Sequence, residues 1–198
     1  MVRARSLYLR GSWFESKQAD MESMENISIA KATADDTLEI QKVLYATWLA
    51  TYPNAETGIT REDIEYRFKD RFTAENITKR TQQFAHPPAG HTTLVAKDGG
   101  RIVGVARMIC TPEKNEVAML YVLPEYQGKK IGLALWEEAQ KVMSPMKETF
   151  VNVVEYNTIA IRFYEKLGFK DTGERLEEER FRMKSGAQMK EIRMKLEK

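Results

Sequence analysis

One short stretch of the chain, Glu116–Ala139, combines residue types that together bind an anion. It begins as an apolar strand and ends as an apolar helix, and the turn between them carries Gln127, Gly128, two lysines and Gly132. The first turn of a helix exposes backbone N–H groups without intrahelical acceptors, at the positive end of the helix dipole. Phosphate groups bind at such helix starts, so we predict a phosphate cradle here.

A second stretch strengthens this interpretation, because the two together resemble one family. VLPEYQGKKIGLA at 122–134 resembles motif A of the GNAT acyltransferases, which move an acyl group, usually acetyl, from coenzyme A to an amine. NTIAIRFYEKLGF at 157–169 resembles the family's N-x-x-A-x-x-F-Y-x-K-x-G-F signature at each of those positions. The spacing between the motifs and the order of the expected elements over 27–196 also agree with the family.

The loop departs from the family at one position. The family pattern is Q/R-x-x-G-x-G/A, which Gln127 and Gly132 fit, whereas Lys130 stands where the first glycine is expected. A non-glycine residue at positive φ costs roughly 1 kcal/mol. We therefore expect Lys130 to be helical, in a first turn where its charge lies near a phosphate.

The resemblance implies acetyl-CoA as co-substrate, no metal, and a set of residues that hold the coenzyme. Asn157 among them is also a good helix N-cap, and both roles are compatible. The coenzyme-binding residues implied by the resemblance are Tyr121, Val122, Leu123, Gln127, Gly128, Lys129, Lys130, Ile131, Gly132, Leu133, Ala134, Asn157, Ala160, Phe163, Tyr164 and Lys166.

Acyl transfer needs a donor to the thioester carbonyl and an acid for the leaving thiolate. By resemblance the donor is the amide of Val122, or of Leu123 beside it, freed from the sheet by a bulge. The acid is Tyr164, since a phenol with pKa about 10 can protonate a developing thiolate. The alternative for Tyr164 is an ordinary core aromatic.

The attacking amine must also lose a proton, because an alkylamine has a pKa of about 10. Glu116 is a candidate base, directly or through water. It lies six residues before Val122, on the same side of a regular strand, although a bulge would alter this. Ribosomal-protein N-terminal acetyltransferases resemble this chain in carrying a glutamate here. A strand-edge carboxylate without a catalytic role is an equal alternative.

The acceptor is expected over the first helices, where Trp48 and Tyr52 share a helix face. Together with Glu116 they are the candidate substrate residues. Aromatic rings with carboxylates suit a cationic amine, such as a polyamine, lysine or a peptide N-terminus. The alternative is that Trp48 packs in the core and the carboxylates are solvated. W-x-x-x-Y-P resembles bacterial polyamine acetyltransferases but is too short to decide. The nearby carboxylates are Glu56, Glu62, Asp63 and Glu65.

Bulk composition excludes several other classes of protein. The 198 residues carry a net charge of only +2 with both signs interspersed, which argues against nucleic-acid binding. No apolar run is long enough to span a membrane. We expect a cytoplasmic protein that is a monomer or a homodimer. The single cysteine, Cys110, excludes an intramolecular disulfide and is expected to be a small buried hydrophobe. Two histidines are too few for a zinc site of the usual kind.

Periodicity and turn residues predict one α/β (α+β) domain over 27–198, with a mixed, mostly antiparallel sheet of about seven strands flanked by helices. Residues 1–26 are expected to be a poorly ordered leader, a tag or an over-long gene start. Expected strands are 27–31, 91–97, 101–111, 116–123, 149–155, 169–183 and 187–196. Expected helices are 33–52, a helix that begins at 60, 74–84, a helix that follows the glycine-containing loop and ends near 144, and 157–167.

The leading functional hypothesis is an N-acetyltransferase that moves acetyl from acetyl-CoA to a primary amine, a polyamine or other small amine, by direct attack in a ternary complex. A protein or peptide acceptor (an N-terminus or a lysine) is one alternative. A non-catalytic acyl-CoA-binding regulator is another.

Overall fold

The computed structural model describes residues 26–197, so the expected leader lies almost wholly outside the described residues. Its centre is a seven-stranded sheet in the order β1-β2-β3-β4-β5-β7-β6. Neighbouring strands are antiparallel except β4 and β5, which are parallel. The strands are β1 (Ile27–Lys31), β2 (His91–Asp98), β3 (Arg101–Cys110), β4 (Lys114–Val122), β5 (Glu148–Val154), β6 (Phe169–Leu176) and β7 (Glu191–Leu196).

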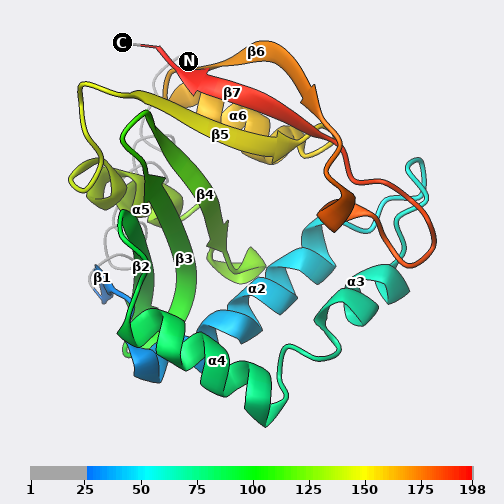
Figure 1. Cartoon of the computed structure of the whole chain (residues 1–198), viewed down its shortest axis with the longest axis horizontal. Helices are drawn as coiled ribbons and strands as arrows, with labels where there is room; N and C mark the ends of the chain where they lie inside the picture. Colours follow the sequence, from blue (N-terminus) through cyan, green and yellow to red (C-terminus); the bar gives the residue numbers. More distant parts are fainter. Residues whose placement is uncertain (1–25, 198) are drawn as a thin grey trace, which may run out of the picture.

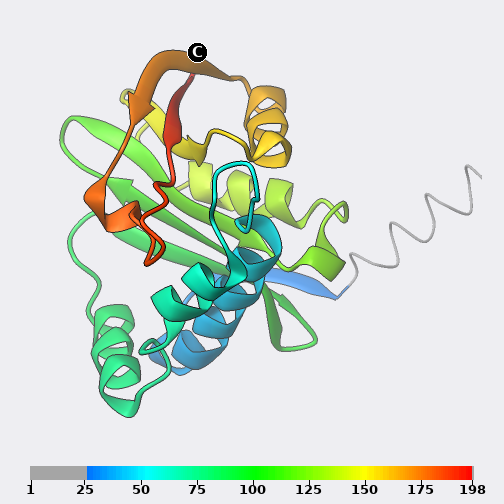
Figure 2. The same cartoon turned by 90° about the vertical axis from the view of Figure 1, so that its right-hand side faces the viewer.

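Helices cover both faces of the sheet (Figures 1 and 2). On one face lie α2 (Thr37–Thr51), α3 (Arg61–Phe68) and α4 (Ala74–Ala85), and on the other lie α5 (Ile131–Gln140) and α6 (Thr158–Lys166). Short 3₁₀ turns are η1 (Ala34–Asp36), η2 (Pro124–Tyr126) and η3 (Glu179–Phe181). The predicted fold class, a mixed and mostly antiparallel sheet flanked by helices, is confirmed.

Local signals in the sequence explain where the helices begin and end. Thr60 caps α3, because its hydroxyl accepts from the Asp63 amide at 3.1 Å and the Asp63 carboxylate accepts from the Thr60 amide at 2.9 Å. Pro53 follows the last residues of α2, where a proline prevents further helix. Gly168 ends α6 at φ 94°, a backbone conformation that favours glycine.

The sheet opens between its two parallel strands. β4 pairs with β5 only from Lys114 to Val117, against Glu148 to Val151. β4 then continues to Val122 and β5 to Val154 without pairing with each other, and the two strands diverge (Figure 1). Backbone groups that face this opening are free to bind something other than a neighbouring strand.

A bulge in β4 lies at the start of the opening. Arg107 of β3 is opposite Met119 whereas Met108 is opposite Val117, so Ala118 is an extra residue. The bulge changes the alternation of side chains, so that Glu116 and Tyr121 point to the α2 face. Val122 points to the α5 face. Its partner on β3 is Gly104, and a Cβ added to Gly104 would lie 3.1 Å from the Leu135 side chain of α5. Glu116 and Val122 therefore point to opposite faces of the sheet. Their expected placement on the same side would hold only in a regular strand.

The two long strands expected at the C-terminus are shorter than predicted. β6 ends at Leu176 and β7 begins at Glu191, so 177–190 form a loop with the turn η3. The loop leaves the sheet because its polar groups bond to α3 instead. The Ser185 amide and hydroxyl each donate to the Asp63 carboxylate at 2.8 Å, and Arg67 donates to the Arg180 carbonyl at 2.7 Å.

The hydrophobic core fills both sides of the sheet, and Met183, Ile192 and Met194 point inward as expected. Cys110 is half-buried rather than fully buried, and its thiol contacts the Val142 carbonyl at 3.7 Å. In the part of the chain that is described, every helix is too short or too polar to cross a lipid bilayer.

Candidate active site

The loop before α5 has the shape of an anion cradle. Gly128 has φ 79° and Lys130 has φ 60° and ψ 5°, so both lie in the left-handed region. The expectation that Lys130 would be helical is therefore wrong. Lys130 is the N-cap of α5 and takes a left-handed conformation that glycine would adopt without a steric cost. Among the described residues it is the only non-glycine with positive φ.

The consecutive backbone amides from Gly128 to Leu133 donate no hydrogen bond to any described residue. The first helical bond of α5 runs from the Ala134 amide to the Lys130 carbonyl at 3.0 Å. A row of free N–H groups at the positive end of a helix binds phosphate oxygens. Lys129 and Lys130 add positive charge beside them, so the loop is suited to binding an anion such as a phosphate.

The predicted coenzyme residues of this loop and the first turn of α5 differ in how their side chains are used. The Gln127 side-chain amide donates to the Val122 carbonyl at 3.1 Å, which ties the loop to the end of β4. The Ile131 side chain is buried, so only its amide is available to a ligand. Leu133 is exposed and Ala134 is half-buried at the surface of the same turn.

The two sequence motifs meet in space where α5 and α6 touch. A Cβ on Gly132 would lie 3.4 Å from the ring of Phe163, so a small residue there lets α6 approach the cradle. Asn157 caps α6 by accepting from the Ala160 amide at 3.1 Å, and its side-chain N–H₂ group is left for another acceptor. Lys166 is exposed at the far end of α6.

The amide that faces the opening is that of Val122. The Leu123 amide donates to the Val103 carbonyl at 2.9 Å, so Leu123 is already paired with β3. Because successive residues in a strand direct their N–H groups to opposite edges, the Val122 N–H points to the other edge. On that edge β5 has already diverged from β4. Of the two predicted carbonyl donors, the geometry leaves Val122.

Tyr164 lies on α6, close enough to Tyr121 of β4 for the two phenols to interact electrostatically. Its side chain is 5% exposed and packs edge-on between the rings of Phe163 and Phe169. Burial raises the pKa of the Tyr164 phenol well above 10, and the nearby Tyr121 phenol adds to this. No hydrogen bond among the described residues involves the Tyr164 hydroxyl. The phenol therefore holds its proton and has it available to donate.

The predicted acceptor residues Trp48 and Tyr52 belong to the wall of the opening. Trp48 is only 7% exposed, and its ring meets that of Tyr52 at 4.7 Å. The Tyr52 hydroxyl lies 3.2 Å from the Tyr121 hydroxyl, which links α2 to β4. Both are core aromatics whose edges help to line the site.

The carboxylates expected beside this aromatic pair lie elsewhere. Asp63 is buried against Thr60 and Ser185, Glu65 pairs with Arg61 at 2.8 Å, and Glu56 and Glu62 are exposed. The group stacked on Trp48 is instead a cation, because the Arg67 guanidinium carbon lies 4.9 Å from the ring centroid. The carboxylates lie at capping and helix-surface positions instead, because negative charge is stabilised near the start of a helix.

Two carboxylates do face the opening from the sheet. Glu116 is paired with Lys114 at 3.0 Å and is partly exposed. Glu191, at the start of β7, is 8% exposed, and burial raises its pKa to about 7, with Glu178 and Glu116 adding to the shift. Glu191 also acts electrostatically on the phenols of Tyr52 and Tyr121. The sequence had not indicated Glu191, because its burial depends on β7 lying between β5 and β6.

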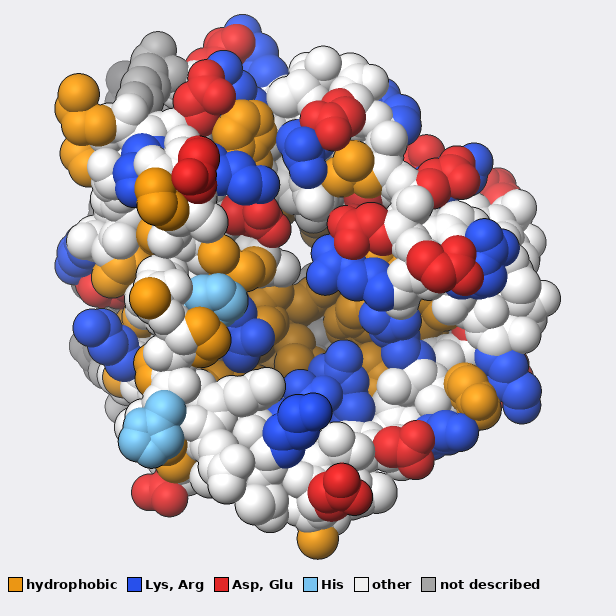
Figure 3. Space-filling model, viewed as in Figure 1, with side chains coloured by type: hydrophobic (Ala, Val, Ile, Leu, Met, Phe, Trp, Pro, Cys, Tyr) orange, Lys and Arg blue, Asp and Glu red, His pale blue; other side chains and the backbone are white. Residues whose placement is uncertain are grey.

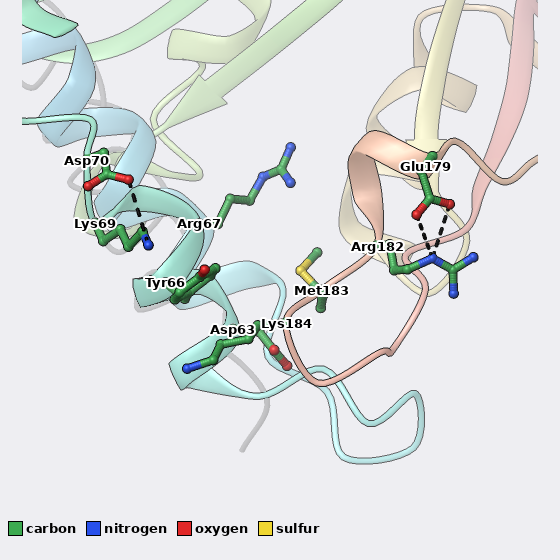
Figure 4. A pocket seen from close by; sticks show the side chains of 9 residues that line it. All are labelled: Asp63, Tyr66, Arg67, Lys69, Asp70, Glu179, Arg182, Met183 and Lys184. Atoms are coloured by element: carbon green, nitrogen blue, oxygen red, sulfur yellow. Dashed lines mark hydrogen bonds and ion pairs between the residues drawn. The ribbon is translucent and has the colours of Figure 1, made fainter.

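A hollow in the surface leads to this opening (Figure 3). Its floor is hydrophobic, and lysine and arginine side chains line its right and lower walls in that view. A separate pocket of about 470 Å³ lies between α3 and the loop that follows β6 (Figure 4). None of the predicted catalytic or coenzyme residues lines that pocket, so it is not the transfer site.

A family model described as an acetyltransferase (GNAT) domain matches residues 55–185. The chain belongs to the GNAT acetyltransferase family. A spermidine N(1)-acetyltransferase of Thermoplasma acidophilum is 28% identical over 148 residues, which cover 73% of this chain and 89% of that protein. An uncharacterised N-acetyltransferase of Mycobacterium tuberculosis is 36% identical over 88 residues, 41% of this chain and 54% of that protein.

Solved structures agree with this GNAT fold. The PaiA N-acetyltransferase of Thermoplasma acidophilum, in complex with coenzyme A, superposes with TM-score 0.65 at 24% identity, covering 87% of this chain and 99% of that one. The ribosomal-protein-S18-alanine N-acetyltransferase of Escherichia coli superposes with TM-score 0.57 at 15% identity, covering 86% and 92%. At these identities the likeness concerns the fold alone. Among the described residues of this GNAT domain, no three His, Cys, Asp or Glu side chains form a cluster suited to a metal ion.

Proposed function

We propose that this GNAT acetyltransferase uses acetyl-CoA and transfers its acetyl group to a primary amine by direct attack in a ternary complex. The single observation that carries this proposal is the opening between β4 and β5. The Val122 amide points to this opening, and in this proposal the buried Tyr164 phenol faces the same space, beside a cradle of free amides. A carbonyl oxygen and a leaving sulfur need these two kinds of donor at one site.

The cradle from Gly128 to Leu133 holds the pyrophosphate of the coenzyme, and the Asn157 amide group is available to the pantetheine arm. The acetyl group then lies beside Val122, whose N–H donates to the carbonyl oxygen. This N–H stabilises the negative charge that develops when the amine nitrogen attacks. When the C–S bond breaks, the sulfur leaves as a thiolate and takes the Tyr164 proton to become the free thiol, and the second proton that the amine nitrogen loses on forming the amide returns to the Tyr164 phenolate.

The incoming amine needs a base, and two carboxylates face the site. A base works best when its pKa lies near the working pH, which fits Glu191 with its pKa raised to about 7. Glu191 therefore takes the ammonium proton in this proposal. Glu116, paired with Lys114, is the alternative base, directly or through water.

The choice of a primary amine rests on family membership and on the spermidine N(1)-acetyltransferase among the relatives. A polyamine, another small amine and a peptide amine are all compatible with that reasoning. A non-catalytic acyl-CoA-binding role would need neither a phenol in the opening nor a carboxylate with a pKa near 7.

Replacing Tyr164 with phenylalanine tests the proposal, because it removes the proton and little else. We expect Tyr164→Phe to bind acetyl-CoA within about twofold of wild type and to turn over at least tenfold more slowly, roughly 1.4 kcal/mol in the barrier. Binding is measured by calorimetry. Turnover is measured by release of free thiol with a panel of polyamines, amino acids and short peptides.

Tyr45→Phe is the matched control, because Tyr45 packs on Phe68 and Phe72 at ring distances of 5.4 and 5.9 Å, outside the opening. It should leave both measurements unchanged. Undiminished turnover in Tyr164→Phe would remove Tyr164 from the role of acid.

A further inference from the structure

Arginines from three separate parts of the chain lie close together. Arg67 lies on α3, Arg71 follows it, Arg80 lies on α4 and Arg107 lies on β3. They are close enough to act on one another, since the charges of Arg80, Arg67 and Arg107 add to burial in lowering the pKa of Arg71 to about 10. Arg71 is still charged at neutral pH. We call these four residues the arginine wall; lysine and arginine side chains also surround the hollow in Figure 3.

None of these arginines has a counter-ion within the part of the chain that the structure describes. No ion pair among residues 26–197 includes Arg67, Arg71, Arg80 or Arg107. Their hydrogen bonds go to neutral groups, such as Arg71 to the Gln41 side-chain oxygen at 3.3 Å and Arg107 to the Thr93 hydroxyl at 3.0 Å. The buried Nε atoms of Arg67 and Arg80 have no acceptor at all. Positive charge and unused donors are concentrated here without an internal partner.

Aromatic rings hold the guanidinium groups in place. Arg67 lies over Trp48 at 4.9 Å, Arg71 over Phe68 at 4.5 Å and Arg107 over Phe84 at 5.6 Å. Stacking on a ring orders the planar fork of an arginine, so less freedom is lost when it binds a carboxylate or phosphate with two hydrogen bonds. The arginines are therefore organised for an anion before it arrives.

The arginine wall lies close to the transfer site and opposite its carboxylates. The Tyr121 phenol, one residue before Val122, interacts electrostatically with Arg67 and with Arg71. Glu116 and Glu191 face the opening from β4 and β7 on the sheet side. Arg67, Arg71 and Glu191 thus all lie within electrostatic reach of the Tyr121 phenol, next to the Val122 amide.

We propose that the acceptor is a small primary amine that also carries a carboxylate or a phosphate. The anion binds the wall formed by Arg67, Arg71, Arg80 and Arg107, and the amine points toward Glu191 and the Val122 amide. This inference rests on the proposed acetyl transfer, of which it names the substrate class. A polyamine would instead bring further ammonium groups against an unneutralised positive wall, which like charges disfavour.

Matched pairs of acceptors test this substrate class, because each pair differs only in the anion. Phosphoethanolamine is compared with ethanolamine, β-alanine with propylamine, and all of them with spermidine, by thiol release from acetyl-CoA. We expect at least one anionic member to exceed its neutral partner, and spermidine, at least tenfold in kcat/KM. Which pair responds distinguishes phosphate from carboxylate.

Arg71→Gln and Arg107→Gln should raise KM for the preferred anionic amine at least tenfold and leave KM for acetyl-CoA unchanged. Arg61→Gln is the control, since Arg61 is exposed on α3 and pairs with Glu65. Equal use of both members of each pair, preference for spermidine, or a loss confined to acetyl-CoA binding would overturn the proposal.

A binding measurement separates this inference from the proposed function. Phosphoethanolamine and β-alanine are titrated into the protein saturated with coenzyme A, so that the phosphate cradle is already filled. At least one should bind, and Arg71→Gln should weaken it at least tenfold. Binding without acetylation of any amine would refute the proposed function and support the anion site. Acetylation of amines without such binding would support the proposed function and refute the anion site.

Discussion

At the scale of single residues, burial of a carboxylate beside tyrosines makes Glu191 the group best suited to accept a proton near neutral pH. Its ordinary pKa of 4.5 rises to about 7, chiefly through burial. The carboxylate is therefore protonated below that value and ionised above it. Glu116, paired with Lys114, is in a different environment on the same side of the sheet. The two can be distinguished by how the rate depends on pH.

We predict that kcat/KM of the wild type rises through about pH 7 and that Glu191→Gln lacks this rise. The residual rate of the variant should increase only at higher pH, as more of the amine is neutral. Glu116→Gln, of equal size and charge change, should keep the rise. The opposite pattern, with the rise kept in Glu191→Gln and lost in Glu116→Gln, would assign the base to Glu116.

Stability gives an independent check on the same carboxylate. Between about pH 4.5 and 7 the folded protein holds a proton on Glu191 that the unfolded chain releases, so this contribution to stability is lost as the pH rises. Glu191→Gln should therefore gain stability relative to wild type at pH 8 compared with pH 5, measured by urea unfolding. An unchanged difference at the two pH values would contradict the raised pKa.

At the scale of elements, the loop from Gln127 to Lys130 places the chain in a left-handed turn directly before α5. At an ordinary first-turn position, alanine is more favourable than glycine. At φ 60° the order should reverse, because the Cβ of alanine is strained there by roughly 1 kcal/mol. The conformation of Lys130 thus has a direct consequence for stability.

We predict that Lys130→Gly is more stable than Lys130→Ala by about 1 kcal/mol, measured by chemical denaturation without coenzyme. Both variants lose the same charge, so their affinity for coenzyme A should fall together relative to wild type. Alanine as the more stable variant would place Lys130 in the helix, as the sequence alone had suggested.

Elements could be predicted well where the signal is local. The capping box at Thr60 and Asp63, the proline after α2 and the glycine after α6 each act within a few residues, and the helices they delimit are present. The sequence signal for the cradle was equally local. The ends of β6 and β7 were not, because the loop between them is fixed by Asp63, which lies far away in the sequence.

The same distinction explains the site. The Val122 opening and Tyr164 come from motifs whose spacing is visible in the sequence. Glu191 and the arginine wall cannot be recognised there, since their burial and grouping follow from the strand order and from the packing of α3 and α4 on α2. Carboxylates near Trp48 in the sequence were expected beside it, yet the structure brings Arg67 to that ring.

At the scale of the whole molecule, the fold joins three regions at one opening. The α5 side supplies the cradle, the diverging strands leave the Val122 amide unpaired, and the surface hollow has lysine and arginine side chains on its right and lower walls (Figure 3). Each region lies on a different layer, so a ligand that spans the sheet can touch all of them. This arrangement fits a reaction in which two substrates approach from opposite faces.

The most direct test follows the acetyl group itself. The protein is mixed with acetyl-CoA labelled in its acetyl carbons and with the preferred amine, and both the amine and the intact protein are weighed by mass spectrometry during a single turnover. The account predicts label on the amine nitrogen, an equal amount of free coenzyme A thiol, and no labelled protein at any time. Label that appears first on the protein, or bound acetyl-CoA that is never transferred to an amine, would contradict it.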